Sequence, residues 1–219
     1  MTAEYLTSDM IIPLRTSDTG EEALSMMNEF VVRHLPIVNN QQLLGLISED
    51  DILDNDTQEA VGSYHLSMTR PYVKHDDHVY EILRLIAEYR LTLIPVVDNE
   101  QNYVGLVTME DLLQYFARAA SFSETGSIIV LEMNKRDYHL SQMARIVESE
   151  GAIVLSSFVT SNVDSARLDV TLKINQQNVQ SIIATLNRFD YEVKATFNEG
   201  EYLDGLKERY DGLMMYLNV

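Results

Sequence analysis

Two nearly identical phrases place a hydroxyl and a carboxylate at the start of a predicted helix. Residues 45–53 read GLISEDDIL and residues 105–113 read GLVTMEDLL, so that Ser48 precedes Asp51, and Thr108 precedes Asp111, by the same spacing. This spacing suits a capping box, in which both side chains bind free backbone N–H groups of the first turn. It also suits a ligand site, because a carboxylate on the first turn can accept hydrogen bonds from both hydroxyls of a ribose. The spacing alone leaves both interpretations open.

The two copies differ in the cations that a phosphate would need. Arg33 and His34 precede the apolar strand of the first copy, whereas residues 92–93 of the second copy are uncharged. We therefore expect at most one strong phosphate pocket, lined by Arg33 and His34, with Arg70 or Lys74 as further candidates. The other site should be weaker, suited to a neutral ligand, or empty. A solvated helix end, where cations offset the helix dipole, explains Arg33 and His34 equally well.

The elements that position these residues also occur twice. The matching stretches are residues 33–53 with 92–113 and residues 15–27 with 73–86. Asp18 and Asp77 are each expected to cap an amphipathic helix, which is followed by two β-branched runs around a polar turn. A second helix should then begin at Ser48 and at Thr108. Each repeat is thus predicted to run strand, helix, strand, strand, helix.

Composition narrows the partners and the chemistry. The 219 residues include 16 Lys and Arg against 34 Asp and Glu, which gives a formal net charge of −18. Such a surface repels nucleic acid and anionic membranes, so we expect neither as a partner. The start of the chain resembles no signal peptide and no stretch is apolar for long enough to span a bilayer, which predicts a soluble cytoplasmic protein. Because the chain has no Cys, disulfides and thiolate chemistry are excluded.

Two units of about 60 residues, each with a hydrophobic-Pro-x-Val strand and a closing Gly-x-hydrophobic-Ser/Thr-x-x-Asp, resemble a tandem pair of CBS domains, the Bateman module. The resemblance covers repeat 1 at residues 1–61 and repeat 2 at residues 62–120. It implies an α/β (α+β) fold with the repeats packed around a pseudo-two-fold axis. It also implies that the clefts between the repeats bind adenosine compounds.

The resemblance further implies a role for each matching residue. It assigns ribose and phosphate contacts to Ser48, Asp51, Thr108, Asp111, Arg33 and His34. It assigns the base side of the ligand, or close backbone approach to it, to Leu35, Pro36, Ile94, Pro95, Gly45 and Gly105. Ordinary turn and core packing is the competing interpretation of these six, and for Pro36 and Pro95 it is the preferred one.

The run His75–His78 (His-Asp-Asp-His) contains residue types that bind zinc and similar ions. It falls at a predicted helix start, with Asp77 as the cap. We therefore interpret it as an exposed loop and predict no metal site.

A second domain follows a polar linker at residues 121–126. Residues 127–197 show the order strand, helix, strand, strand, helix, strand, which is the ferredoxin-like pattern. After paired CBS repeats this pattern resembles an ACT domain, and the combination resembles the acetoin-utilisation accessory proteins. The loop at residues 135–140 keeps Arg136 and Leu140 but has Asp137 and Tyr138 where ACT domains usually have Pro and Gly, so sheet-edge dimerisation is favoured over an amino-acid ligand. Residues 198–219 are predicted to form an amphipathic C-terminal helix.

These patterns favour a non-enzymatic sensor over an enzyme. No nucleophile elbow, P-loop or paired metal motif is present. We expect no catalytic cofactor and a homodimer whose regulatory ligand is AMP, ADP, ATP or a related adenosyl compound. A constitutive dimerisation scaffold with empty pockets, or an amino-acid sensor acting through the ACT-like domain, are the alternatives. The regulated partner does not follow from the sequence.

Overall fold

The computed structural model describes residues 1–67, 71–161, 166–198, 214 and 216. The chain divides into two compact units, residues 1–116 and residues 117–219. Apart from residues 198, 214 and 216, the predicted C-terminal helix lies outside the described residues, and so does the candidate cation Arg70. Within the described part of the chain, no helix combines the length and the apolar character needed to cross a membrane.

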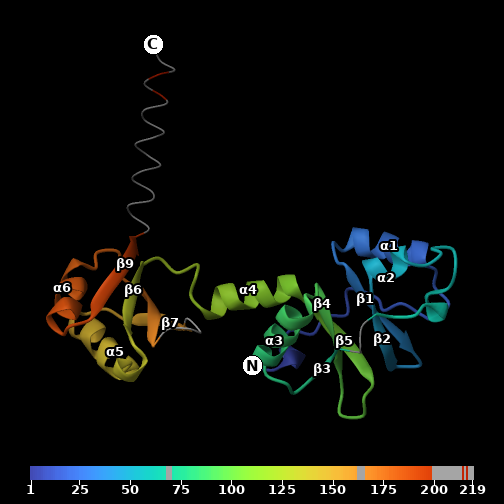
Figure 1. The fold of residues 1–219 in the computed structure, drawn as a ribbon, viewed down its shortest axis with the longest axis horizontal. Helices are drawn as coiled ribbons and strands as arrows, with labels where there is room; N and C mark the ends of the chain where they lie inside the picture. The colour runs from blue at the N-terminus through green and yellow to red at the C-terminus, as the bar shows by residue number, and fades with distance from the viewer. Residues whose placement is uncertain (68–70, 162–165, 199–213, 215, 217–219) are drawn as a thin grey trace. The chain divides into compact units, whose positions relative to one another are not determined.

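The first unit confirms the predicted order of elements in both repeats (Figure 1). Repeat 1 contains α1 (Gly20–Glu29), β1 (His34–Asn39), β2 (Gln42–Ser48) and α2 (Glu49–Leu53). Repeat 2 contains β3 (Val73–Lys74), α3 (Val79–Tyr89), β4 (Leu93–Val97), β5 (Tyr103–Thr108) and α4 (Met109–Ala119). Short 3-10 turns η1 (Ala3–Tyr5) and η2 (Val61–Ser63) complete the unit. The leading strands are much shorter than the helices, because β3 has two residues and its counterpart in repeat 1 is a single parallel bridge from Leu14 to Ile37.

The two hairpins have equivalent registers. In β1–β2, His34 pairs with Ser48, and in β4–β5, Leu93 pairs with Thr108. Each hairpin has one register shift, after Ile37 and after Val96 respectively. The shared register therefore brings the Ser or Thr of each repeat to the strand end where a helix begins.

The helix caps differ from the predicted ones by one residue. Thr19, not Asp18, caps α1 in a capping box with Glu22, and His78, not Asp77, caps α3. The predicted aspartates instead close the turn before each helix: Asp18 Oδ2 accepts the Arg15 N–H at 2.8 Å, and Asp77 Oδ2 accepts the Lys74 N–H at 2.8 Å. Short polar side chains can cap a helix or close the turn before it, and residue propensity alone does not tell which of two neighbours takes which role.

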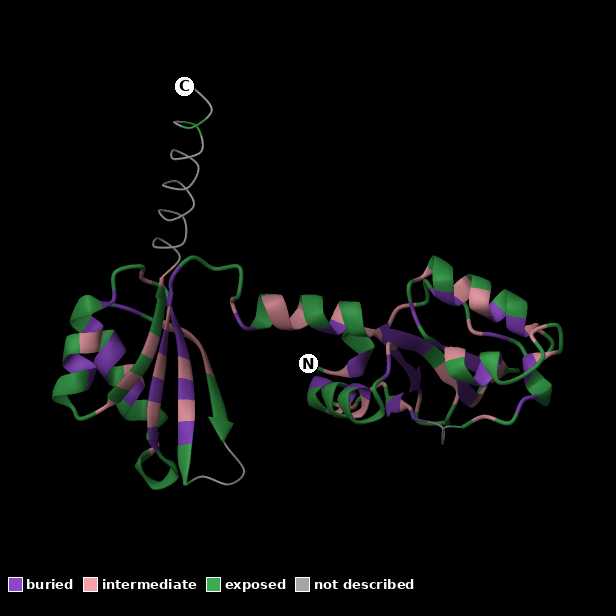
Figure 2. Cartoon of the chain, turned by 45° about the horizontal axis from the view of Figure 1, so that its top comes forward, coloured by how far each residue is buried: buried purple, intermediate pink, exposed green. Residues whose placement is uncertain are grey.

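A single hydrophobic core extends through both repeats (Figure 2). Its fully buried members include Leu35 and Ile47 from the first repeat and Leu93, Ile94 and Leu106 from the second. Full burial of a side chain of this size contributes about 1.5 to 3 kcal/mol. Since these side chains share one core, separating the repeats would expose it, and the pair is expected to fold as a unit.

The segments that precede the two repeats cross over. Residues 2–8 bond to repeat 2, where the Ser8 N–H donates to Leu106 O at 2.8 Å and the Leu106 N–H donates back to Ser8 O at 3.1 Å. The corresponding segment before repeat 2, residues 64–67, lies on repeat 1, where the Ser67 N–H donates to Asp51 Oδ1 at 3.0 Å. The crossing brings Ser67 to a predicted site residue.

The second unit is the predicted ferredoxin-like domain. It runs β6 (Ser127–Asn134), η3 (Lys135–Asp137), α5 (Leu140–Ser149), β7 (Val154–Ser161), β8 (Arg167–Ile174), α6 (Gln180–Arg188) and β9 (Glu192–Asn198). The antiparallel sheet has the order β7-β8-β6-β9, and both helices cover one face of it (Figure 1). Strand β6 alternates between buried and half-buried residues, as expected for a sheet with one covered face.

Candidate functional site

In repeat 1, the Ser48–Asp51 pair forms a closed capping box. Asp51 Oδ2 accepts the Ser48 N–H at 2.9 Å and the Ser48 hydroxyl at 2.7 Å, while the Asp51 N–H donates to Ser48 Oγ at 3.1 Å. The second oxygen, Oδ1, accepts the Ser67 N–H at 3.0 Å. Asp51 is only 5% exposed, so both carboxylate oxygens are occupied by the chain itself and covered from solvent.

The same contacts set the acidity of the Asp51 carboxyl. Burial acts to raise its pKa, but the hydrogen bonds from Ser67 and Ser48 favour the charged form and outweigh burial. The net result is a pKa below the ordinary value for aspartate. Asp51 is therefore held as a carboxylate by groups of its own repeat pair, with no ligand needed.

In repeat 2, the matching pair is half open. Asp111 Oδ2 accepts the Thr108 hydroxyl at 2.6 Å and the Thr108 N–H at 3.2 Å, and the Asp111 N–H donates to Thr108 Oγ1 at 3.0 Å. Asp111 Oδ1 accepts no hydrogen bond within the part of the chain that the structure describes. Both residues are partly exposed, and they begin α4, an eleven-residue helix, whereas α2 has five residues.

The difference between the Asp51 and Asp111 sites comes from the two crossing segments. Residues 5–8 (YLTS) and 64–67 (YHLS) hold the same place in the two repeats, yet the Ser67 N–H bonds to a carboxylate and the Ser8 N–H bonds to a strand backbone. Similar sequences thus close the site at Asp51 and leave Asp111 Oδ1 without a hydrogen bond from the described residues.

Gly45 and Gly105 admit these crossing segments. A Cβ at Gly105 would lie 2.5 Å from Thr7 Cγ2 and 2.9 Å from Ser8 O, and Gly105 has a φ of +152° that side chains disfavour. A Cβ at Gly45 would lie 2.7 Å from Leu66 Cδ1. Close backbone approach was expected at both glycines, and in the structure the approaching group is the chain itself.

The two predicted phosphate ligands lie in different environments. The Arg33 side chain is 66% exposed and its Nε donates to Glu49 Oε2 at 2.8 Å, a surface ion pair of the kind that contributes little. His34 is 8% exposed; its Nδ1 accepts the Thr92 N–H at 3.2 Å and lies 3.0 Å from Thr92 Oγ1. Burial, and then the charge of Arg33, lower the pKa of His34. His34 is thus a neutral link between the repeats, and Arg33 is the cation that can turn toward a ligand.

Arg33 also lies close to the start of α4. The backbone N–H of Arg33 donates to Thr92 Oγ1 at 2.9 Å. The backbone N–H of Met109, the first residue of α4, donates to Thr92 O at 2.9 Å. The backbone of Arg33 is therefore joined through one residue to the helix that carries Asp111. Lys74, the remaining described candidate, is exposed, and its N–H bonds to Asp77.

The residues predicted on the base side of a ligand are buried in the core or the strands. Leu35 and Ile94 are fully buried, Pro36 pairs with Leu46, and Pro95 pairs with Leu106. Their side chains contribute to packing, which is the interpretation that we preferred for Pro36 and Pro95. The backbone carbonyl of Pro36 also serves the fold, because it accepts the Leu14 N–H at 2.8 Å.

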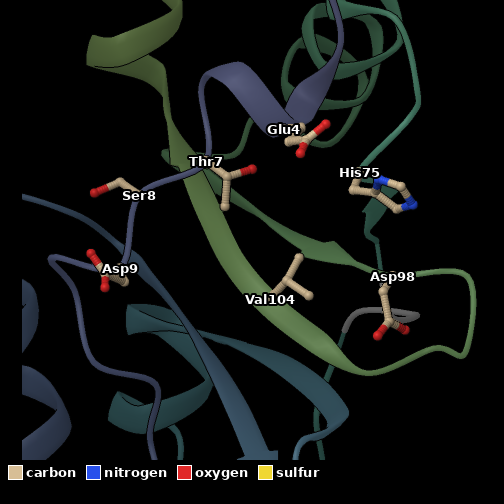
Figure 3. A pocket seen from close by; sticks show the side chains of 7 residues that line it. All are labelled: Glu4, Thr7, Ser8, Asp9, His75, Asp98 and Val104. Carbon is tan, nitrogen blue, oxygen red and sulfur yellow. The ribbon is translucent and has the colours of Figure 1, made fainter.

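A separate hollow of about 540 Å³ lies at the far end of the β4–β5 hairpin (Figure 3). It is lined by Glu4, Thr7, Ser8, Asp9, His75, Asp98 and Val104. Val97 pairs with Tyr103 at this end, whereas Leu93 pairs with Thr108 at the other, so the hollow is distinct from the Thr108–Asp111 site. Nothing in the sequence pattern indicated it, because its walls come from the N-terminal segment, from strand β5 and from two loops of repeat 2.

The residues of the His75–His78 run have separate structural roles. His78 caps α3, where its Nδ1 accepts the Tyr80 N–H at 3.3 Å, and Asp77 closes a turn, while His75 lines the hollow. Across the described residues, no group of three or more His, Asp or Glu side chains is arranged to hold a metal ion.

In the second unit, the loop compared with ACT ligand loops is exposed. Residues 135–137 form a 3-10 turn in which Arg136 Nε lies 3.7 Å from Asp137 Oδ1. Asp137 also accepts the Asn134 side-chain amide at 3.1 Å. Its polar groups are thus partly satisfied locally.

Comparison with known proteins also divides the first unit into two repeats. The model of the CBS domain family matches residues 3–57 and 61–118, together more than half of the chain. Inosine-5′-monophosphate dehydrogenase of Methanocaldococcus jannaschii is 29% identical over 109 residues, which cover 48% of this chain and 21% of that enzyme, so the chain spans about a fifth of this relative. A solved CBS domain pair/ACT domain protein from Thermotoga maritima is 23% identical, with a TM-score of 0.49, over 54% of this chain and 98% of that chain. CBSX2, solved in complex with AMP, is 21% identical, with a TM-score of 0.46, over 53% of this chain and 96% of that chain.

Proposed function

The chain belongs to the CBS domain family, and we propose that it is a non-enzymatic regulatory protein whose second repeat binds an adenosine-containing ligand such as AMP, ADP or ATP. The observation that carries this proposal is that Asp111, a partly exposed residue at the start of α4, has one carboxylate oxygen, Oδ1, that accepts no hydrogen bond from the described residues. Proteins with paired CBS domains are typically regulatory and not catalytic. The match to the dehydrogenase covers only its CBS part, so it carries no catalytic machinery to this chain.

The chemistry of the Thr108–Asp111 pair fits a ribose. A carboxylate oxygen with a free lone pair accepts the hydroxyls of a cis-diol, and such charge-assisted hydrogen bonds contribute about 1.5 to 3 kcal/mol each. The cap stays intact during binding, because it uses the other oxygen, Oδ2. A ribose can therefore bind without breaking the start of α4.

Arg33 is the proposed phosphate ligand. Its guanidinium leaves only an exposed ion pair with Glu49, and its backbone is tied to the start of α4 through Thr92. Exchanging Glu49 for a phosphate is favourable for Arg33, because bidentate Arg–phosphate hydrogen bonds are stronger than an exposed ion pair. Binding of this kind uses the carboxylate of repeat 2 and the cation of repeat 1.

The first repeat is proposed not to bind the same ligand in this conformation. A ribose at Asp51 would have to displace the Ser67 N–H from Oδ1 and enter a site that is 95% covered. One ligand per chain is the expected stoichiometry.

We further propose that the second unit, as an ACT-like domain, forms a homodimer through its sheet. On the face that the helices leave open, the described strands expose large apolar side chains at Phe158 and Phe197. Covering them against a second copy would remove apolar area from water, which favours association. The cytoplasmic location stays a prediction from the sequence.

Thermal melting with AMP, ATP and adenosine tests the site. A ligand that binds only the folded protein raises the melting temperature by mass action. Asp111→Ala should abolish the shift with all three compounds, whereas Arg33→Gln should weaken AMP and ATP by about tenfold or more and leave adenosine unchanged.

Asp51→Ala is the matched control. It lowers the melting temperature of the free protein but should keep the ligand-induced rise. A ligand shift that survives Asp111→Ala, or that disappears only with Asp51→Ala, would overturn the assignment to repeat 2. No shift with any of the three compounds would favour a dimerisation scaffold with empty pockets.

A further inference from the structure

The second unit has a pocket of its own between α5 and the end of α6, with a volume of about 350 Å³. It is lined by Gln142, Arg145, Ile146, Ser149, Phe189 and Tyr191. We propose that this pocket binds a small organic anion that carries a flat apolar ring, such as an aromatic carboxylate.

The charge of the ligand follows from Arg145. Among the described residues, the Arg145 side chain has no ion pair and no hydrogen bond, although Glu148 lies one turn away on the same helix. Two other basic side chains of the unit are neutralised, because Arg167 pairs with Glu132 at 3.0 Å and Lys194 Nζ pairs with Asp169 at 2.7 Å. In a chain with a net charge of −18, an unneutralised guanidinium in a pocket is a specific attraction for an anion.

The flat ring follows from the opposite wall. Phe189 is 59% exposed at the end of α6, beside Tyr191 and the buried Ile146. The Arg188 guanidinium carbon lies 5.8 Å from the centre of the Phe189 ring, which adds a second cation near the rim. An aromatic wall beside a guanidinium fits a planar apolar body with an acidic group, since rings stack and the carboxylate takes paired N–H donors.

The wall is held in place before any ligand arrives. Asp190 has a φ of +62°, a left-handed turn that an aspartate tolerates, and it ends α6. The turn lets the Tyr191 N–H donate to Leu186 O at 3.1 Å and the Tyr191 hydroxyl donate to Gln142 Oε1 at 3.1 Å. Because the amide oxygen of Gln142 is the acceptor, its N–H₂ group remains a donor for an anion.

Titration of the full chain with phenylacetate, followed by ¹H–¹⁵N NMR, tests the proposal. Amide signals of residues 142–149 and 189–191 should shift at millimolar ligand, and added salt should weaken binding. The neutral isostere phenylacetamide and the ring-free anion acetate should each bind at least about tenfold more weakly, because each loses one of the two contacts.

Arg145→Gln and Arg136→Gln form a matched pair of variants. Both remove an exposed guanidinium from the same unit, but Arg136 does not line the pocket. Arg145→Gln should weaken phenylacetate by about tenfold, and Arg136→Gln should leave it unchanged, with unaltered melting temperatures in both. Equal binding of phenylacetamide and phenylacetate, equal effects of the two variants, or no shifts at residues 142–149 and 189–191 would overturn the proposal. None of these outcomes bears on adenosine binding, which uses the first unit.

Discussion

Replacing Asp51 by alanine should cost far more stability than replacing Asp111, although the two residues occupy the same position of the repeat. Asp51→Ala leaves the Ser48 cap in place but removes the carboxylate half of the capping box, which accepts the Ser48 N–H, and Ser48 is only 8% exposed. The carboxylate half of the capping box contributes about 1 kcal/mol, and a buried unpaired donor costs about 1 to 3 kcal/mol. The Ser67 N–H adds less, because Ser67 is exposed. We expect a total of about 3 kcal/mol.

Asp111→Ala removes the matching carboxylate half of the capping box at Thr108, which is partly exposed. Water reaches Thr108 and replaces the lost acceptor, so the cost should be about 1 kcal/mol. The predicted difference of about 2 kcal/mol is due to burial and to the contact with Ser67, not to residue type.

Calorimetry of the ligand-free protein measures this difference, because it separates the transition of the first unit from that of the second. For a unit of this size, 1 kcal/mol shifts the midpoint by about 4 to 8 °C. The transition of the first unit should therefore fall by roughly 12 °C or more for Asp51→Ala and by roughly 4 to 8 °C for Asp111→Ala. Equal shifts would refute the conclusion that Asp51 is closed and Asp111 open.

Three further predictions follow from single residues. Because the folded pKa of Asp51 lies below its unfolded value, its contribution is full above about pH 4 and is lost as pH falls through the folded pKa; acid titration of unfolding free energy should show this loss in wild type and not in Asp51→Asn. The folded pKa of His34 also lies below its unfolded value, so the unfolded chain takes up the proton first and stability should fall as pH drops below about 6.5. His34→Gln should flatten this dependence between about pH 8 and about pH 5, and an unchanged slope would contradict the conclusion that burial lowers the pKa of His34. Gly105→Ala should destabilise more than Gly45→Ala, because Gly105 has a positive φ and faces the Ser8 backbone, whereas Gly45 faces the flexible end of a leucine; urea unfolding of both variants compares them.

The sequence predicted the order of elements well because each element has its own local pattern. Apolar spacing defined α1 and α3, and paired β-branched runs defined the hairpins, so no long-range contact was needed. The caps were placed one residue early because Asp18 and Asp77 satisfy the turn and Thr19 and His78 satisfy the helix. Local propensity does not distinguish such neighbours.

The sequence pattern could not predict that the chain itself covers the Asp51 carboxylate and not the Asp111 carboxylate. Ser8 and Ser67 stand at equivalent positions in similar segments, and the pattern treats them alike. Their different partners depend on how each segment crosses to the other repeat, which is a tertiary feature. The sequence therefore indicated an asymmetry only in the cations, through Arg33, while the structure shows a second asymmetry in the carboxylates.

The two asymmetries act together under the proposed function. The backbone of Arg33 in repeat 1 and the first residue of α4, the helix that carries Asp111, both bond to Thr92. A ligand that binds Asp111 through its ribose and Arg33 through its phosphate must span both repeats. Its affinity then depends on their relative placement, and ligand binding favours the arrangement in which both contacts form. Adenosine, which lacks the phosphate, should bind without this preference, so AMP should strengthen the Thr92 contact between the repeats and adenosine should not.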